Sequence, residues 1–242
     1  MSKTKFYNID IDVLNQDETL TRCRDFINSS SNHLLFFVNA HCFNIAQKNT
    51  SYLKVLNTCD LLLNDGVGIK MGAKLAGIKL KENMNGTDFV PKLLEFASKF
   101  KQNVFFLGGK EGIALAAKQN TKLKLPDISI VGFRNGYFNF DADSEVITDI
   151  LNKKTDILIV GMGVPRQELW LTKNKEKLTG VKISVAGGAV LDFISGNVSR
   201  APLWMRKIGL EWLFRLIHEP MRLFKRYIIG IPQYYYYLFK LK

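Results

Sequence analysis

The sequence predicts an α/β fold, with a Rossmann-like, largely parallel sheet flanked by helices and a helical appendage at the C-terminus. Three observations predict it. Short apolar runs alternate with helical patterns from the N-terminus onward, several of these runs end in glycine or in one polar residue, and only helical patterns follow residue 198. The 242 residues suffice for one substantial domain with a buried core. We therefore expect a Rossmann-like domain over 1–198 and an appendage over 199–242.

The predicted strands are the apolar runs, which are short enough to be buried strands of a parallel sheet. In chain order we expect them over residues 6–13, 34–38, 61–63, 104–107, 128–132, 156–160 and 181–186.

The predicted helices lie between these runs. One helix over 17–28 has acids in its first turn, and another opens with Ala40 and His41 directly after Asn39. A helix over 86–100 has Thr87 as its expected cap. The remaining helices are expected after the turns at Asp65 and Gly109, and over 144–152 and 165–174.

The stretch LLLNDGVGIK at 61–70 contains the candidate for a general base. Leu61 to Leu63 read as the end of a buried strand, and the chain then turns at Asp65 and glycine. In an open α/β sheet, ligands bind outside the carboxyl ends of the strands, so Asp65 would face a crevice. The alternative is that Asp65 only shapes the turn or caps the next helix, as Asp does in many Asp-Gly pairs.

Pairs of glycines also follow several predicted strands. Glycine allows close approach of the backbone to a ligand, and the next helix offers free N–H groups to a phosphate, which suits a nucleotide diphosphate. The GMGVPR stretch does not match GxGxxG, so a dinucleotide site is poorly supported, and glycines are also ordinary turn formers. The glycines in question are Gly108, Gly109, Gly161, Gly163, Gly187 and Gly188.

Positive charge is concentrated at the C-terminal end. The net charge is +12, and residues 200–242 hold nine Lys or Arg against two acids. An apolar stripe formed by Trp204, Ile208, Trp212 and Leu216 indicates a face docked on the core or, together with the basic residues, a face at an anionic membrane surface. Arg215, Arg222 and Arg226 would share a helical face, although Pro220 should break or restart the helix. The uncharged run at 227–239 is too short to span a bilayer.

Neither a metal site nor a disulfide framework is expected. The three cysteines have no CxxC spacing, the three histidines are scattered, and no apolar signal segment opens the chain, which favours reduced thiols in the cytoplasm. The two DxD pairs, at 10–12 and 141–143, are of a kind frequent by chance. No zinc-finger, RRM or KH pattern accompanies the basic charge, so nucleic-acid binding remains only an alternative, as do a non-catalytic nucleotide-binding membrane protein and an oxidoreductase.

Several motifs together resemble one family. GVPRQELW at 163–170, the double glycine with DFISG at 187–196, and RAPLWMRKIGLEWLFRLIHEPMRLFKRY at 200–227 closely resemble the WecG/TagA/CpsF glycosyltransferases. NDGVGI, NGTDF and FFLGG fit the same pattern in order. The resemblance covers about residues 6 to 228, and its long C-terminal motif is specific.

The resemblance implies an inverting, metal-independent glycosyltransferase without cofactor, peripheral on the inner face of the cell membrane. It would move a sugar, N-acetylmannosamine or a related hexose, from a UDP donor to a polyprenyl-diphosphate-linked saccharide in the synthesis of cell-surface polysaccharide or teichoic acid. A homo-oligomer is compatible with it, and nucleic acid is not an expected partner.

The resemblance also implies roles for the motif residues. By this resemblance, Asp65 stands at the position of the proposed base, and Asn39 and Gln167 stand at positions that line the site. Arg215, Arg222 and Lys225 stand at positions in an appendage that closes over the site. The other donor-site candidates are His41, Asn64, Gly66, Asn83, Asp88, Glu168 and the six strand-end glycines. The other candidates for the acceptor diphosphate or the membrane are Arg200, Arg206 and Arg226.

The chain departs from the family pattern at two positions. Phe37 stands where a Thr is expected two residues before Asn39, and Asn83 stands where relatives often have Arg. The resemblance therefore does not identify the donor sugar.

Overall fold

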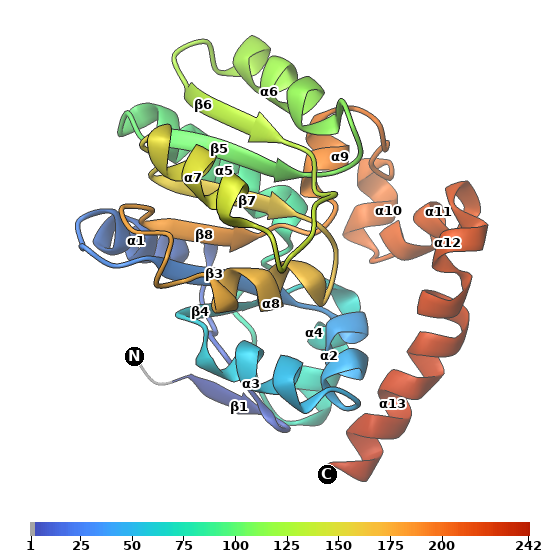
Figure 1. The fold of residues 1–242 in the computed structure, drawn as a ribbon. Coiled ribbons are helices and arrows are strands. Elements are labelled where there is room, and N and C mark those ends of the chain that lie inside the picture. The colour runs from blue at the N-terminus through green and yellow to red at the C-terminus, as the bar shows by residue number, and fades with distance from the viewer. Residues whose placement is uncertain (1–2) are drawn as a thin grey trace.

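A parallel sheet forms the centre of the computed structural model, which describes residues 3–242 (Figure 1). Its neighbouring strands pair in the order β4-β3-β8-β7-β5-β6, all in parallel. The strands are β3 (His33–Val38), β4 (Leu61–Asn64), β5 (Asn103–Gly108), β6 (Ser129–Arg134), β7 (Ile157–Gly161) and β8 (Ile183–Ala186). Because all six run the same way, their carboxyl ends lie along one edge of the sheet, as the sequence predicts.

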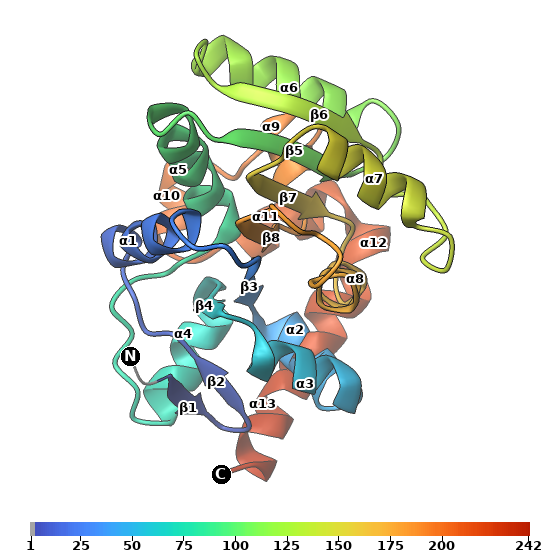
Figure 2. The same cartoon turned by 60° about the vertical axis from the view of Figure 1, so that its left-hand side comes forward.

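Helices cover both faces of the sheet (Figure 2). Successive side chains of a strand point to opposite faces, so the apolar runs feed two separate cores. On one face the strands pack against α1 (Gln16–Ile27), α5 (Gly86–Lys99), α6 (Ile113–Lys124) and α9 (Val190–Ile194). On the other they pack against α2 (Ala40–Ala46), α3 (Thr50–Thr58), α4 (Gly66–Leu75), α7 (Ser144–Asn152) and α8 (Arg166–Lys173).

Asparagine caps begin four of these helices. The side-chain oxygens of Asn15, Asn39, Asn49 and Asn85 accept backbone N–H groups of the first turns of α1, α2, α3 and α5. The expectation that Thr87 caps the helix over 86–100 is wrong, because Asn85 occupies that position and the Thr87 hydroxyl donates to its Oδ1 at 2.7 Å. The helix α3 was not expected from the sequence.

The N-terminal segment forms a hairpin rather than the single strand expected over 6–13. β1 (Thr4–Phe6) and β2 (Ile9–Ile11) pair antiparallel across a turn in which Tyr7 adopts a φ of 56°. Asn57 stabilises this turn, since its amide donates to the Asn8 carbonyl at 3.0 Å and its Oδ1 accepts from the Asp10 N–H at 2.9 Å. The turn therefore depends on a residue of α3, far along the chain.

The C-terminal chain is helical and ends against the main domain. It consists of α10 (Leu203–Lys207), α11 (Glu211–His218), α12 (Pro220–Phe224), a π-helical turn (Lys225–Ile229) and α13 (Gly230–Lys240). Pro220 restarts the helix, as expected. α13 packs on α2 and α4 (Figure 1). Within residues 3–242, no helix combines the length and the apolar character needed to cross a membrane.

The predicted stripe of Trp204, Ile208, Trp212 and Leu216 does not form a single docked face. Gly209, with a φ of 78°, separates α10 from α11, so the four side chains do not follow one helix. Trp204 and Ile208 are 62% and 61% exposed, whereas the Trp212 ring packs edge-on against Tyr227 at 5.8 Å. The buried anchor of the C-terminal chain is instead Tyr234 with Leu238, from the uncharged run at 227–239.

Candidate active site

Asn39 and Asp65 lie side by side because their strands are neighbours. Val38 of β3 pairs with Asn64 of β4. Asn39 is the residue after Val38, and Asp65 is the residue after Asn64. The Asp65 N–H donates to the Val38 carbonyl at 2.8 Å, and Asn39 Nδ2 donates to Asp65 Oδ2 at 3.2 Å. Asn39 Oδ1 accepts the N–H groups of His41 and Cys42 at the start of α2. Because both backbone groups require the oxygen, the amide nitrogen must face Asp65.

The Asp65 carboxylate is not used as a helix cap. Asp65 occupies the N-cap position of α4, yet its side chain makes no capping hydrogen bond, so the capping role that the sequence left open does not apply. Burial raises the pKa of Asp65, against the opposing effects of the Asn39 hydrogen bond and of the positive charge of Arg226. The carboxylate therefore remains free to accept a proton, and when ionised it is a stronger base than an exposed aspartate.

A cavity of about 700 Å³ opens at this edge of the sheet. Asn39, Asp65 and the glycines at the end of β7 and directly after β8 form one side of it, and α11, α12 and the π-helical turn form another. This volume lies within the usual range for small-ligand sites. Close approach of the chain at the floor requires glycine, since a Cβ added to Gly161 would lie 2.9 Å from the Gly188 carbonyl oxygen.

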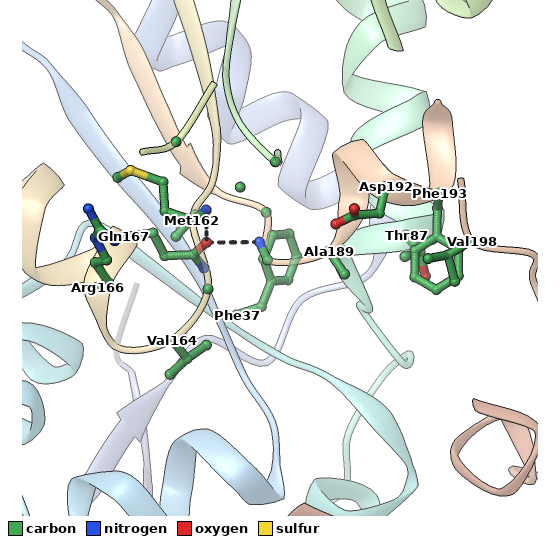
Figure 3. A pocket seen from close by; sticks show the side chains of 18 of the residues that line it. Phe37, Thr87, Met162, Val164, Arg166, Gln167, Ala189, Asp192, Phe193 and Val198 are labelled. Carbon is green, nitrogen blue, oxygen red and sulfur yellow. Dashed lines mark hydrogen bonds between the residues drawn. The ribbon is translucent and has the colours of Figure 1, made fainter. Parts of the chain in front are cut away.

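Gln167 joins the turns that follow β7 and β8 (Figure 3). Its Oε1 accepts from the backbone N–H of Met162 at 3.3 Å and of Gly188 at 3.1 Å. Its Nε2 donates to Glu168 Oε1 at 2.9 Å, which fixes the orientation of the amide. Gln167 thus holds the two glycine turns at a set separation.

Two titratable groups of the cavity are shifted toward their neutral forms. Glu168 is 1% exposed, its Oε2 has no hydrogen-bond partner among residues 3–242, and burial raises its pKa to about 7. Burial, with a smaller contribution from Arg226, lowers the pKa of His41 to about 4. His41 is therefore uncharged at neutral pH, and Glu168 is partly protonated.

Three arginines reach the cavity from the C-terminal chain. Arg215, Arg222 and Arg226, the arginine cluster, all line it even though Pro220 interrupts the helix that was expected to align them. Arg215 lies over the Phe193 ring at 5.2 Å, and Arg222 pairs with Glu219. The Nε atoms of Arg215 and Arg226 are buried and find no acceptor in the described part of the chain. Buried donors beside a cavity are suited to an anionic ligand.

Most of the residues singled out from the sequence meet in this cavity. Its lining includes Asn39, His41, Asp65, Gly109, Gly161, Gly163, Gln167, Glu168, Gly187, Gly188, Arg215, Arg222 and Arg226. The structure places Asn64, Gly66, Asn83, Asp88, Gly108, Arg200, Arg206 and Lys225 outside that lining.

Several of the outlying residues have partners that explain their position. Asp88 pairs with Arg200 and, at 3.7 Å, with Arg206, which ties α5 to the segment before α11. Asn83 Oδ1 accepts from the Gly66 N–H at 2.7 Å and so supports the turn after Asp65. Asn64 is buried and donates to the Glu82 carbonyl.

The cavity also contains residues that the sequence did not single out as site candidates. Among them are Phe37, Thr87, Arg166, Asp192, Phe193 and Glu211 (Figure 3 shows the first five). Phe37 could have been found, because a strand residue two before Asn39 points to the same side. Glu211 and Glu219 could not have been predicted to line the cavity, since nothing in their local sequence indicates that α11 folds over the strand ends.

One carboxylate of each DxD pair has a structural partner. Asp12 accepts the Leu62 N–H at 2.8 Å, and Asp143 accepts the Trp170 indole N–H at 2.7 Å. In the described range, 3–242, no group of three or more His, Cys, Asp or Glu side chains is arranged to hold a metal ion.

Comparison with known proteins identifies relatives of the whole chain. The model of the "Glycosyl transferase WecG/TagA/CpsF family" matches residues 4–242. A protein of Bacillus subtilis (strain 168) is 31% identical over 211 residues, which cover 87% of this chain and 80% of the relative. One of Bacillus spizizenii is 34% identical over 189 residues, 78% of this chain and 72% of the relative. One of Staphylococcus aureus (strain MW2) is 26% identical over 243 residues, which cover 100% of this chain and 94% of the relative. All three are named N-acetylglucosaminyldiphosphoundecaprenol N-acetyl-beta-D-mannosaminyltransferase.

Proposed function

Because the chain belongs to the WecG/TagA/CpsF family of glycosyl transferases, we propose that it moves an N-acetylmannosamine-type sugar from a UDP donor to a saccharide carried on a polyprenyl diphosphate. The chain is a glycosyltransferase; the donor and acceptor are the proposal. The relatives support it, since their names specify an N-acetylmannosaminyl group and an N-acetylglucosaminyldiphosphoundecaprenol. The product would enter a cell-surface polysaccharide or teichoic acid.

The observation that carries the proposal is the Asp65 carboxylate beside Asn39 in a cavity that the arginine cluster lines. The acceptor hydroxyl oxygen attacks the anomeric carbon of the donor sugar, and its proton passes to Asp65. The bond from the anomeric carbon to the UDP oxygen breaks, and its electron pair leaves with UDP. One displacement inverts the anomeric centre, through a transition state with oxocarbenium character.

Negative charge grows on the departing diphosphate and must be neutralised. We propose that the arginine cluster meets this charge, together with backbone N–H groups at the glycine turns and without a metal ion. Support comes from the buried Nε donors of Arg215 and Arg226, which have no acceptor within residues 3–242. The same cationic surface would hold the diphosphate of the lipid acceptor. We place the reaction at the inner face of the cell membrane, where the basic appendage would meet anionic lipid.

Replacing Asp65 by Asn tests the role of the base. We expect D65N to lower transfer by about 10²- to 10⁴-fold, because the amide cannot accept the hydroxyl proton. The measurement is product formation from UDP-N-acetylmannosamine and a short-chain lipid-diphosphate acceptor. UDP should still raise the melting temperature of D65N, and the exposed control Asp127→Asn should retain wild-type turnover. Turnover of D65N at the wild-type rate would remove Asp65 from the mechanism.

A further inference from the structure

A second groove, of about 640 Å³, runs along the outer side of α4, apart from the active-site cavity. Val67, Lys70, Met71 and Lys74 line it at spacings of three, four and seven, so they form one face of the helix. The chain over 77–83 forms the other wall, with Ile78 and Leu80 adding apolar surface. The opposite face of α4 is covered, since Gly72 packs against Tyr234 of α13. The groove is therefore the free side of an otherwise packed helix.

Unpaired positive charge surrounds this apolar groove. Four lysines line it, and only Lys81 has an ion-pair partner within residues 3–242, namely Glu18. The one acid of the lining is Glu82, whose carboxylate accepts the backbone N–H of Gln16 at 2.8 Å. The three remaining lysines are Lys70, Lys74 and Lys79. Ammonium groups above an apolar floor match a ligand that has a negative head and an apolar chain.

Exposed apolar side chains continue the surface of the groove in both directions. On one side, a Cβ built on Gly209 would lie 3.2 Å from Val67 Cγ2, so the end of α10 abuts the groove. The neighbouring side chains of α10 and its C-cap, Leu203, Trp204 and Ile208, are all more than 60% exposed. On the other side, the Tyr235 hydroxyl lies 3.3 Å from the sulfur of Met71, which is itself 50% exposed. Indole and phenol groups at the border of an apolar surface are typical of membrane interfaces.

We propose that the α4 groove binds an anionic phospholipid of the membrane, with its acyl chain along Val67 and Met71 and its phosphate at Lys70, Lys74 and Lys79. The main domain itself would then contact lipid, in addition to the basic C-terminal appendage. A second copy of the chain fits the groove less well, because a symmetric contact would bring the same lysines against each other. A soluble phosphate would leave the apolar floor uncovered.

Charge reversal in the groove tests the electrostatic part. The full chain should sediment with vesicles that contain anionic phosphatidylglycerol, and Lys70→Glu/Lys74→Glu should weaken this binding roughly tenfold or more. The matched control is Lys118→Glu/Lys122→Glu on α6, at the opposite edge of the sheet, with the same spacing and the same change of charge. It should weaken binding much less. Equal losses in the two variants, or equal binding of wild type to purely neutral vesicles, would overturn the proposal.

A fluorescent label tests the contact itself. The three native cysteines are buried, so Met71→Cys can carry an environment-sensitive dye, and Leu123→Cys on α6, at an 81% exposed position, is the control. Anionic vesicles should shift the emission of the dye at position 71 to the blue and leave that at 123 unchanged. Water-like emission at position 71 in vesicle-bound protein would show that the groove does not face lipid. Neither assay needs turnover, so both stay decisive if the proposed transfer reaction is wrong.

Discussion

At the scale of single residues, partners distinguish the candidate base from the other strand-associated acids. Asp60 accepts the Leu34 N–H at 2.9 Å and pairs with Lys175, and its pKa is lowered although burial opposes this. Asp65 receives one amide hydrogen bond from Asn39, and burial raises its pKa. Both acids lie next to the same strand, so the different roles come from neighbours that are distant in sequence.

Glu168 supplies a prediction about pH and stability. Its pKa is about 7 in the folded state against a reference of 4.5, so between these values the unfolded state binds fewer protons than the folded state. The free energy of unfolding should therefore fall as pH rises from about 4.5 to about 7, and then level off. In Glu168→Gln, the side-chain oxygen can still accept the hydrogen bond from Gln167, and the fall in stability with rising pH should disappear because the amide does not titrate.

We expect Glu168→Gln to unfold like wild type near pH 4.5 and to be more stable than wild type at pH 8, by up to about 3 kcal/mol. Urea unfolding at several pH values measures the difference. A difference that does not change with pH would show that Glu168 titrates normally in the folded protein.

At the scale of elements, α13 is held by a few specific contacts. Asn44 Nδ2 of α2 donates to the Gly230 carbonyl at 2.7 Å, and the Tyr234 hydroxyl donates to the Gly68 carbonyl at 3.0 Å. Gly72 makes room for the Tyr234 ring, because a Cβ there would collide with the hydroxyl and lie 2.9 Å from Phe6 Cζ. The sequence of α4 thus includes a glycine whose purpose is the docking of a helix more than 150 residues later.

Gly72→Ala tests this docking. Intrinsic helix propensity favours Ala by up to about 1 kcal/mol, whereas overpacking should cost about 1 to 3 kcal/mol, so we expect net destabilisation in urea unfolding. Tyr234→Phe removes the hydroxyl that collides, so Gly72→Ala should cost less in that background. If the changes in the free energy of unfolding caused by the two substitutions were strictly additive, the proposed contact between position 72 and the Tyr234 hydroxyl would be contradicted.

At the scale of the whole molecule, the candidate site is assembled from both ends of the chain. The amide of Asn39 directly follows β3, the carboxylate of Asp65 directly follows β4, and the glycine turns follow β7 and β8. The arginine cluster comes from the chain after residue 199. A cavity of this kind exists only when α11, α12 and the π-helical turn lie over the strand ends.

Arg226 and Lys225 give a matched comparison at this scale. They are adjacent in sequence, but only Arg226 lines the cavity. We expect Arg226→Ala to lower kcat/KM by about 10- to 100-fold, the usual loss for a charged hydrogen-bond donor, and Lys225→Ala to change it less than about twofold. Arg226 also lowers the pKa of Asp65, so its removal should move the acid limb of the pH-rate profile to higher pH. An equal loss of kcat/KM in Arg226→Ala and Lys225→Ala would indicate a general effect of positive charge rather than a role for Arg226 in the cavity.

Local pattern was sufficient for most elements and for part of the site. Buried strands read as apolar runs because both faces of a parallel sheet are covered, and Asp65 and the glycine turns follow directly from the strand ends. The single strand expected over 6–13 failed because Asn57, from another element, stabilises a turn within it. Asp192 lines the cavity without having been singled out, since its place there depends on elements distant in sequence, whereas strand alternation was sufficient to place Phe37 on the same side as Asn39.

The sequence by itself determined the parallel α/β sheet, the edge at which ligands would bind, the acid at that edge and the concentration of positive charge after residue 199. Only the tertiary structure decided that Asn39 contacts Asp65 and that Gln167 joins two glycine turns. It also decided that three arginines on separate helical segments line one cavity, and that α4 has an uncovered groove lined by lysines. The reason is physical. Periodicity and turn chemistry act over a few residues, whereas these arrangements depend on strand order and helix docking between parts of the chain that are distant in sequence.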